Sequence, residues 1–302
     1  YVMHKKILPV IAMIATASQA SAQSAKDPLV LKPVSSWHVD YADDRCRLGR
    51  EFGEGEQQTY LFLDRYGPGE YFRLLLAGKE VRSISDKTEA TVQFGPTEKE
   101  QQLHFFRGNL AKLPALVFTT QARIAPPSDA DVLAIKNKNK GDDWIDLELI
   151  SAERQKAVKY LSFDKPLRRQ ITLQTGSMRA PLVALDKCID NLMTTWGIDV
   201  EKHRTLSRAL TPQQSPGKWV VSQDYPLNML SAGQPALVEF RLSVGADGVP
   251  TACHIQSTTR PKEFDEAVCK SVMRRARFDP ALDATGKPLA SYYRNTVRFQ
   301  IP

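Results

Sequence analysis

The sequence predicts an α+β protein in two parts. The first part is a mainly antiparallel β domain, a sandwich or a barrel, with a C-terminal helix; the second is an α-β-β-α-β domain with a three-stranded antiparallel sheet. Residues 36–120 alternate apolar and polar side chains in short runs, which is typical of strands. Residues 177–197 repeat apolar side chains at helical spacing. Residues 217–302 combine both patterns.

The composition is that of an ordinary globular protein. The chain has 302 residues, of which 42% are hydrophobic and 8% aromatic. This length suffices for two domains, and the composition excludes collagen-like, coiled-coil and wholly disordered proteins. The 41 Lys and Arg residues exceed the 34 acidic residues and give a net charge of +7. Because most of the excess is scattered, we expect no nucleic-acid partner.

The first residues have the pattern of an export signal. Two lysines precede an apolar run from Ile7 to Ala15, and small residues then lead to Ala22. We expect a signal peptide over residues 1–22, cleaved after Ala22. The apolar run is shorter than the roughly 20 residues of a membrane span. If the signal were retained, it would anchor the protein in the inner membrane.

Residues 27–200 are expected to form the first domain. The alternating runs of residues 36–120 are separated by Gly-rich turns, as in antiparallel sandwiches and barrels. We expect further strands at Trp144–Ile150 and Arg169–Gln174, and a short helix at Ala152–Leu161.

The helix that ends this domain has clear boundaries. Ser177 can cap its first turn, and Gly197 is expected to end it. Cys188 lies among its periodic apolar positions, so we expect this cysteine on the buried face of the helix.

A linker is expected at residues 201–216, which contain two prolines and an aperiodic stretch. Residues 217–302 then form the second domain. Its expected elements are a helical turn from Tyr225, strands at Val238–Val244 and Val249–Gln256, a helix at Lys262–Ala276 and a strand at Ala290–Ile301. The first of these strands alternates apolar and polar side chains, which predicts that it is half-buried. The helices should cover one face of the sheet.

Cys46, Cys188, Cys253 and Cys269 form an even set in an exported chain, which predicts disulfides. Three pairings are possible. In the expected topology Cys253 points from its strand toward the helix that carries Cys269. We therefore predict a Cys253–Cys269 disulfide, which leaves Cys46 to pair with Cys188.

Several short stretches of the C-terminal region form a recognisable set: Tyr225-Pro226, Val238–Val244, Asp247-Gly248-Val249, Ser257, Phe264–Val268, Arg275–Ala281 and Gly286-Lys287-Pro288. In these stretches the sequence resembles the C-terminal domain of TonB-type energy transducers. The resemblance covers residues 217–302 with the order of the elements intact. The upstream domain is not similar to any family that we identify from the sequence.

The resemblance implies that the domain binds an extended peptide, the TonB box of an outer-membrane receptor. In the family this peptide adds as a strand beside the last strand, here Tyr292 to Gln300. The protein would then be periplasmic, take part in TonB-dependent transport and have no enzymatic activity. The peptide-binding residues expected from this resemblance are Ser222, Gln223, Tyr225, Pro226, Tyr292, Arg294, Thr296 and Arg298.

The predicted edge has other interpretations. Arg294 and Arg298 could belong to a solvated face that blunts the edge against aggregation. The edge could also be covered by the upstream domain, or by a second copy of the domain in a homodimer.

The main alternative function is an envelope hydrolase or a ligand-binding protein with its site in residues 27–200. The sequence contains no Gly-x-Ser-x-Gly, His-Glu-x-x-His or P-loop motif. Gln174 stands where an aspartic protease loop has its carboxylate, and Ser177 fits a helix cap better than a nucleophile. No Cys or His spacing fits a metal site. We therefore predict no catalytic residue, no metal and no small-molecule cofactor.

Overall fold

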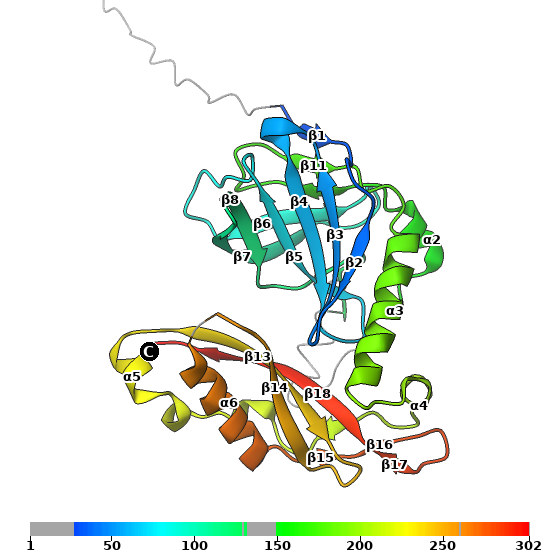
Figure 1. The fold of residues 1–302 in the computed structure, drawn as a ribbon, viewed down its shortest axis with the longest axis vertical. Helices are drawn as coiled ribbons and strands as arrows, with labels where there is room; N and C mark the ends of the chain where they lie inside the picture. The colour runs from blue at the N-terminus through cyan, green and yellow to red at the C-terminus, as the bar shows by residue number, and fades with distance from the viewer. Residues whose placement is uncertain (1–26, 129, 132–148, 260, 302) are drawn as a thin grey trace, which may run out of the picture.

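The computed structural model describes residues 27–128, 130–131, 149–259 and 261–301 (Figure 1). The predicted signal peptide lies outside the described residues, as does most of the strand expected at Trp144–Ile150. Two hydrophobic cores form in the described part of the chain, one within residues 29–198 and one within residues 219–299. No helix among the described residues has the length and the apolar character that a membrane span requires.

The first core lies inside one large sheet, which agrees with the predicted mainly antiparallel β region. In the described residues its strands are β1 (Leu29–Leu31), β2 (His38–Tyr41), β3 (Cys46–Phe52), β4 (Thr59–Arg65), β5 (Tyr71–Gly78), β6 (Glu89–Phe94), β7 (Gln101–Leu110), β8 (Leu113–Phe118), β9 (Ala122–Arg123), β10 (Leu161–Phe163) and β11 (Ile171–Leu173). Their order is β1-β11-β10-β6-β7-β8-β5-β4-β3-β2, with β9 beside β5. The strands pair antiparallel except for the parallel pair β1–β11.

This sheet closes into a barrel. The Gly53 N–H donates to the Lys32 carbonyl at 2.9 Å, and the Val34 N–H donates to the Glu51 carbonyl at 3.0 Å. These bonds join the chain that follows β1 to the end of β3, the strand next to β2, so they bring the first strand of the order back to the last two. The inward side chains of the alternating strands fill the barrel interior. We refer to this closed sheet as the barrel.

Where the structure describes the chain after the long strands of the barrel, it contains the helices α2 and α3. The helix α2 (Ala152–Ala157) is shorter than predicted, because Leu161 begins β10, where it is buried between β6 and β11. The helix α3 (Arg179–Thr195) lies along β2 and β3 and extends toward the C-terminal region (Figure 1). It starts just after Ser177, whose hydroxyl accepts from the Arg179 N–H, and it ends before Gly197, whose φ of 77° favours glycine.

The C-terminal region contains the predicted α-β-β-α-β order. Its elements are α4 (Val200–Arg204), β12 (Thr211–Pro212), two 3₁₀ turns η2 (Pro216–Lys218) and η3 (Ser222–Asp224), α5 (Leu227–Ser231), β13 (Ala236–Val244), β14 (Pro250–Thr258), α6 (Lys262–Arg275), β15 (Phe278–Asp279), β16 (Ala281–Leu282), β17 (Pro288–Leu289) and β18 (Ser291–Phe299). The strands β14-β13-β18, in this order, form an antiparallel sheet, which we call the C-terminal sheet.

One face of the C-terminal sheet is covered by α6. The helix buries Phe264, Val268 and Val272 against β13 and β14. The turn between these strands needs Gly248, since a Cβ there would lie 2.0 Å from the Phe278 carbonyl oxygen.

The residues predicted as a linker are bonded to the C-terminal region. The strand β12 pairs with β15, and the Gln213 N–H donates to the Arg277 carbonyl at 2.9 Å. The α4 helix precedes β12. The aperiodic sequence is therefore held by long-range pairing that local patterns do not reveal.

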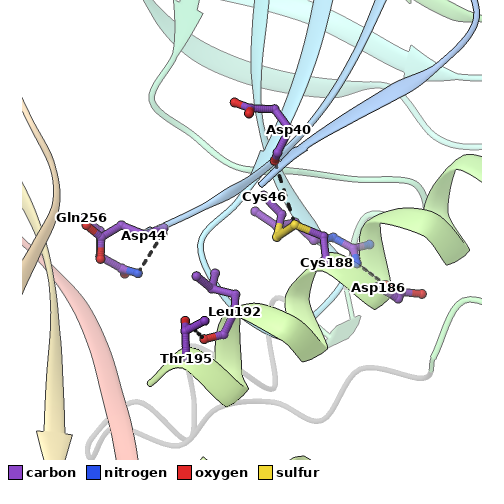
Figure 2. Close-up of a disulfide and its surroundings, with 9 residues drawn as sticks. Asp40, Asp44, Cys46, Asp186, Cys188, Leu192, Thr195 and Gln256 are labelled. Carbon is purple, nitrogen blue, oxygen red and sulfur yellow. Dashed lines mark hydrogen bonds and ion pairs between the residues drawn. A yellow bond between two sulfur atoms is a disulfide. The ribbon is translucent and has the colours of Figure 1, made fainter. Parts of the chain in front are cut away.

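Two disulfides join strands to helices in the predicted pairing. Cys46 of β3 bonds to Cys188 of α3 (Figure 2), and Cys253 of β14 bonds to Cys269 of α6. The bridges span 142 and 16 residues of sequence. Each one fastens a helix to the sheet that it covers.

The two bridges should differ in their contribution to stability. Loop entropy predicts that the double variant C46A/C188A loses up to about 5 kcal/mol in free energy of unfolding and C253A/C269A about 3 kcal/mol. Urea titrations of both variants and of the wild type measure these losses. Equal losses, or a larger loss from the short bridge, would contradict the loop-entropy account.

Candidate functional site

The strand β18 lies at an edge of the C-terminal sheet. Among the described residues it pairs only with β13, so one row of its backbone groups has no strand partner. The Thr296 N–H belongs to that row, as its hydrogen bond shows. This N–H donates to the Asn295 side-chain oxygen at 2.7 Å and not to a neighbouring strand. Because alternate residues of an antiparallel strand point to the same side, the open row also contains Tyr292, Arg294 and Arg298.

The side chains of β18 divide between two faces. Tyr293 and Phe299 are buried in the core beneath α6. Tyr292, Arg294, Thr296 and Arg298 lie on the opposite face, as predicted from the alternation. This face is directed toward the barrel (Figure 1). The groups that cover it change along the strand.

The middle of this outer face packs on the barrel. Gln256 of β14 donates its amide to the Asp44 and Tyr66 carbonyls at 3.2 and 3.1 Å, and Figure 2 shows the contact with Asp44. Arg73 of β5 forms an ion pair with Glu239 of β13, and both side chains are almost fully buried. The strand β13 is therefore buried on both faces, where the sequence predicted a half-buried strand.

The start of β18 is covered by the end of α3. The Tyr292 ring lies 5.4 Å from Trp196 and 6.3 Å from His203, measured between ring centroids. The guanidinium of Arg241 lies 4.2 Å from the Trp196 ring centroid. Desolvation by these groups raises the pKa of Tyr292. The side chain of Tyr292 is thus an interface group.

Arg294 is a cation held in the same interface. Its Nε donates to the Gln256 side-chain oxygen at 2.8 Å, and its guanidinium lies 5.9 Å from the Tyr66 ring centroid. Desolvation lowers the pKa of Arg294 to about 10, and the Arg73 charge acts in the same direction. The described residues offer it no ion-pair partner. Arg294 therefore stays charged at neutral pH and favours a nearby anion.

Beyond this contact the two regions separate and leave a cleft. We use this name for a cavity of about 1410 Å³ between the C-terminal sheet and the outer surface of the barrel. The residues of β18 and its extension that line it are Arg294, Asn295, Thr296, Arg298, Phe299, Gln300 and Ile301. On the barrel side it is lined by the loop after β4, by β7 and by the segment after β8. The cleft thus reaches the open edge of β18.

Four other residues predicted to bind peptide lie elsewhere. Ser222 and Gln223 are exposed in η3, and Pro226 caps α5; none of them lines the cleft. Tyr225 packs against Phe264 and Phe299 and donates its hydroxyl to the Gln234 carbonyl at 2.6 Å. The structure therefore groups Arg294, Thr296 and Arg298 but not the segment around Tyr225.

The barrel wall of the cleft was not predicted from the sequence. Tyr71 and Phe106 line it with 39% and 52% of their surface exposed. In β7, Leu103 and Phe105 point into the barrel, so Phe106 occupies an outward position. A large aromatic side chain at an outward position is the local signal that could have identified this wall.

A smaller cavity of about 410 Å³ lies beside the Cys46–Cys188 bridge. Arg241, His254 and Asp44 line it, and desolvation lowers the pKa of His254. Two aspartates in the lining offset the arginine charge, so the cavity has no clear preference for an anion. In the described residues, no group of three or more His, Cys, Asp or Glu side chains is arranged to hold a metal ion.

The Arg73–Glu239 pair should be important for stability. Replacing Arg73 with Ala leaves the buried Glu239 carboxylate without its cation, which should cost about 3 kcal/mol in free energy of unfolding. Lys79→Ala is the matched control, because Lys79 pairs with Glu56 at the surface and should cost at most about 0.5 kcal/mol. Urea unfolding of both variants measures the difference, and similar small losses would show that the buried pair is not important.

Asp224 predicts a pH-dependent contribution to stability. Hydrogen bonds from Arg275 lower its pKa from 3.8 to about 2. Because the native pKa is lower than the unfolded one, this stabilisation of about 2 kcal/mol is complete above pH 3.8 and is lost as the pH falls through about 2. The stability gap between wild type and Asp224→Asn should shrink over this window in unfolding experiments at fixed ionic strength. A gap that stays constant would contradict the assignment.

The comparison with known proteins identifies one part of the chain. No curated protein matches the sequence. A family model described as Gram-negative bacterial TonB protein C-terminal matches residues 221–301, which include β13, β14, α6 and β18. The family is associated with transport and is not catalytic. This match confirms the resemblance seen in the sequence: residues 221–301 are similar to the C-terminal domain of Gram-negative bacterial TonB proteins.

Proposed function

We propose that this protein is a periplasmic TonB-like protein whose C-terminal domain captures an extended peptide at the open edge of β18. The peptide would be the TonB box of an outer-membrane receptor in TonB-dependent transport. We also propose two domains, residues 27–200 and 217–302, joined by residues 201–216. The first domain would hold the outer face of the C-terminal sheet and leave its edge accessible.

The observation that carries this proposal is the unpaired backbone row of β18. An extended peptide gains affinity from main-chain hydrogen bonds when it adds to an exposed sheet edge. The Thr296 N–H is available for such a bond once the Asn295 side chain rotates away, since that side chain is its partner in the free protein. The Asn295 side chain protects the edge and can be displaced by a peptide carbonyl.

Arg298 supplies charge at the same edge. It is exposed, it lines the cleft, and in the described residues it has no ion-pair partner. Exposed charges near a binding site mainly change the association rate and its dependence on salt. Arg298 therefore favours peptides with acidic groups over basic ones.

Two variants of β18 test the capture of peptide at this edge. Thr296→Pro removes a donor from the open row while the β13 ladder keeps its own donors, and it should weaken binding about tenfold. Thr296→Ala keeps the donor and should bind normally. Arg298→Glu should weaken binding about three- to tenfold at low salt, with Lys270→Glu on α6 as the charge-reversal control.

The measurement is a titration of the full chain with synthetic peptides that cover the TonB boxes of outer-membrane receptors, followed by fluorescence anisotropy. Circular dichroism checks that each variant is folded, since exposed substitutions usually change stability by only about 0.5 kcal/mol. Unchanged affinity in folded Thr296→Pro and Arg298→Glu would rule out capture at β18.

A further inference from the structure

The two walls of the cleft carry exposed apolar side chains that face a common space. Phe106 and Tyr71 belong to the barrel, and Ile301 follows β18; they are exposed by 52%, 39% and 42%. Exposed large apolar side chains that gather in a concave surface are typical of interaction sites. The volume of about 1410 Å³ exceeds the range of roughly 300–1,000 Å³ that is typical of small-molecule pockets. The cleft is therefore large enough for a chain segment.

The charges of the cleft do not cancel. Its carboxylates are each bonded to an arginine, in the pairs Asp64–Arg47, Glu70–Arg123 and Glu239–Arg73. Three further arginines line the cleft without an ion-pair partner in the described part of the chain: Arg107, Arg294 and Arg298. Within the described residues, Arg107 donates only to the Ser83 hydroxyl and to backbone carbonyls, which do not neutralise its charge. The cleft is therefore electropositive.

The geometry of an added strand connects the open edge to the cleft. Successive side chains of a strand point to opposite faces of the sheet, and side chains of neighbouring strands at paired positions lie about 5 Å apart. Half of the side chains of a peptide beside β18 would therefore lie on the same face as Arg294, Thr296 and Arg298. This is the face that borders the cleft. Such side chains would reach both the arginines of β18 and the barrel wall.

We propose that the barrel forms the second wall of the peptide site, so that the cleft selects an extended segment with an acidic side chain and a large apolar one on the same face. The acidic group lies beside Arg294 or Arg298, and the apolar group packs against Phe106 and Tyr71. The proposal rests on the capture of peptide by β18 and adds a role for the N-terminal domain: it contributes to peptide recognition.

The test uses the full chain and the same receptor peptides. Phe106→Ala should weaken binding about five- to tenfold, because it removes about half of the burial energy of a large apolar side chain. Ile84→Ala is the matched control, since Ile84 is a barrel residue with 70% exposure that does not line the cleft. A peptide whose acidic residues are replaced by Lys should bind at least about tenfold more weakly than its parent at low salt. This difference should shrink as salt is added.

A photoreactive benzoylphenylalanine in place of Phe106 provides a second readout. The proposal predicts a crosslink to the peptide from position 106 and none from position 84. Normal binding by Phe106→Ala together with impaired binding by Thr296→Pro would overturn the proposal that the barrel contributes to the peptide site. It would leave the proposed capture at β18 intact. If no receptor peptide binds the wild type, both proposals fail. A crosslink between two copies, with a dimer that Phe106→Ala dissociates, would show that a second copy occupies the cleft and would overturn the proposal.

Discussion

The packing of the C-terminal sheet on the barrel is the constraint on which the rest of the structure depends. Glu239 of β13 is buried under the barrel and forms an ion pair with Arg73, which lies 166 residues earlier in the chain. Gln256 of β14 donates to two barrel carbonyls beside it. A buried carboxylate needs its cation and an amide needs its acceptors. These contacts therefore favour one placement of the sheet and, with it, the position of β18.

This placement covers much of both faces of the C-terminal sheet and leaves the edge of β18 without a strand partner in the described residues. The helix α6 covers one face, and the barrel covers the middle of the other. Neither of them pairs with β18, and the side chain of Asn295 occupies an edge donor that a strand would otherwise take. Because a side chain and not a strand occupies this donor, a peptide strand can still take its place. The proposed function uses this property.

The sequence predicts the elements whose signals are local. The alternation of apolar and polar residues predicts the strands β13 and β18. Apolar residues at helical spacing predict α3 and α6 and the faces that these helices bury. The position of Cys253 in its alternating strand places it on the face toward α6, which predicts its disulfide with Cys269. The sequence does not decide between a sandwich and a closed barrel, because closure depends on hydrogen bonds between residues 32–34 and 51–53, and local alternation does not reveal such long-range bonds.

The interface is missed for a related reason. Glu239, Arg241 and Tyr292 occupy positions that in an isolated domain would face water, so their alternation looks like that of a half-buried sheet. Their partners Arg73 and Trp196 lie far away in sequence. The barrel wall of the cleft is missed as well, although an aromatic residue at the outward position 106 was a usable signal. Pairing between distant segments is decided by tertiary contacts that local patterns do not encode.

The central claim is that an extended peptide adds its backbone to β18. The most direct measurement is amide hydrogen exchange of the full chain by NMR, with and without a saturating receptor peptide. The account predicts slower exchange for the open row of β18, with Thr296 among the amides that gain protection, and no change along β14, the other edge of the sheet. Protection along β14, or unchanged exchange in β18 when the peptide is bound, would contradict it.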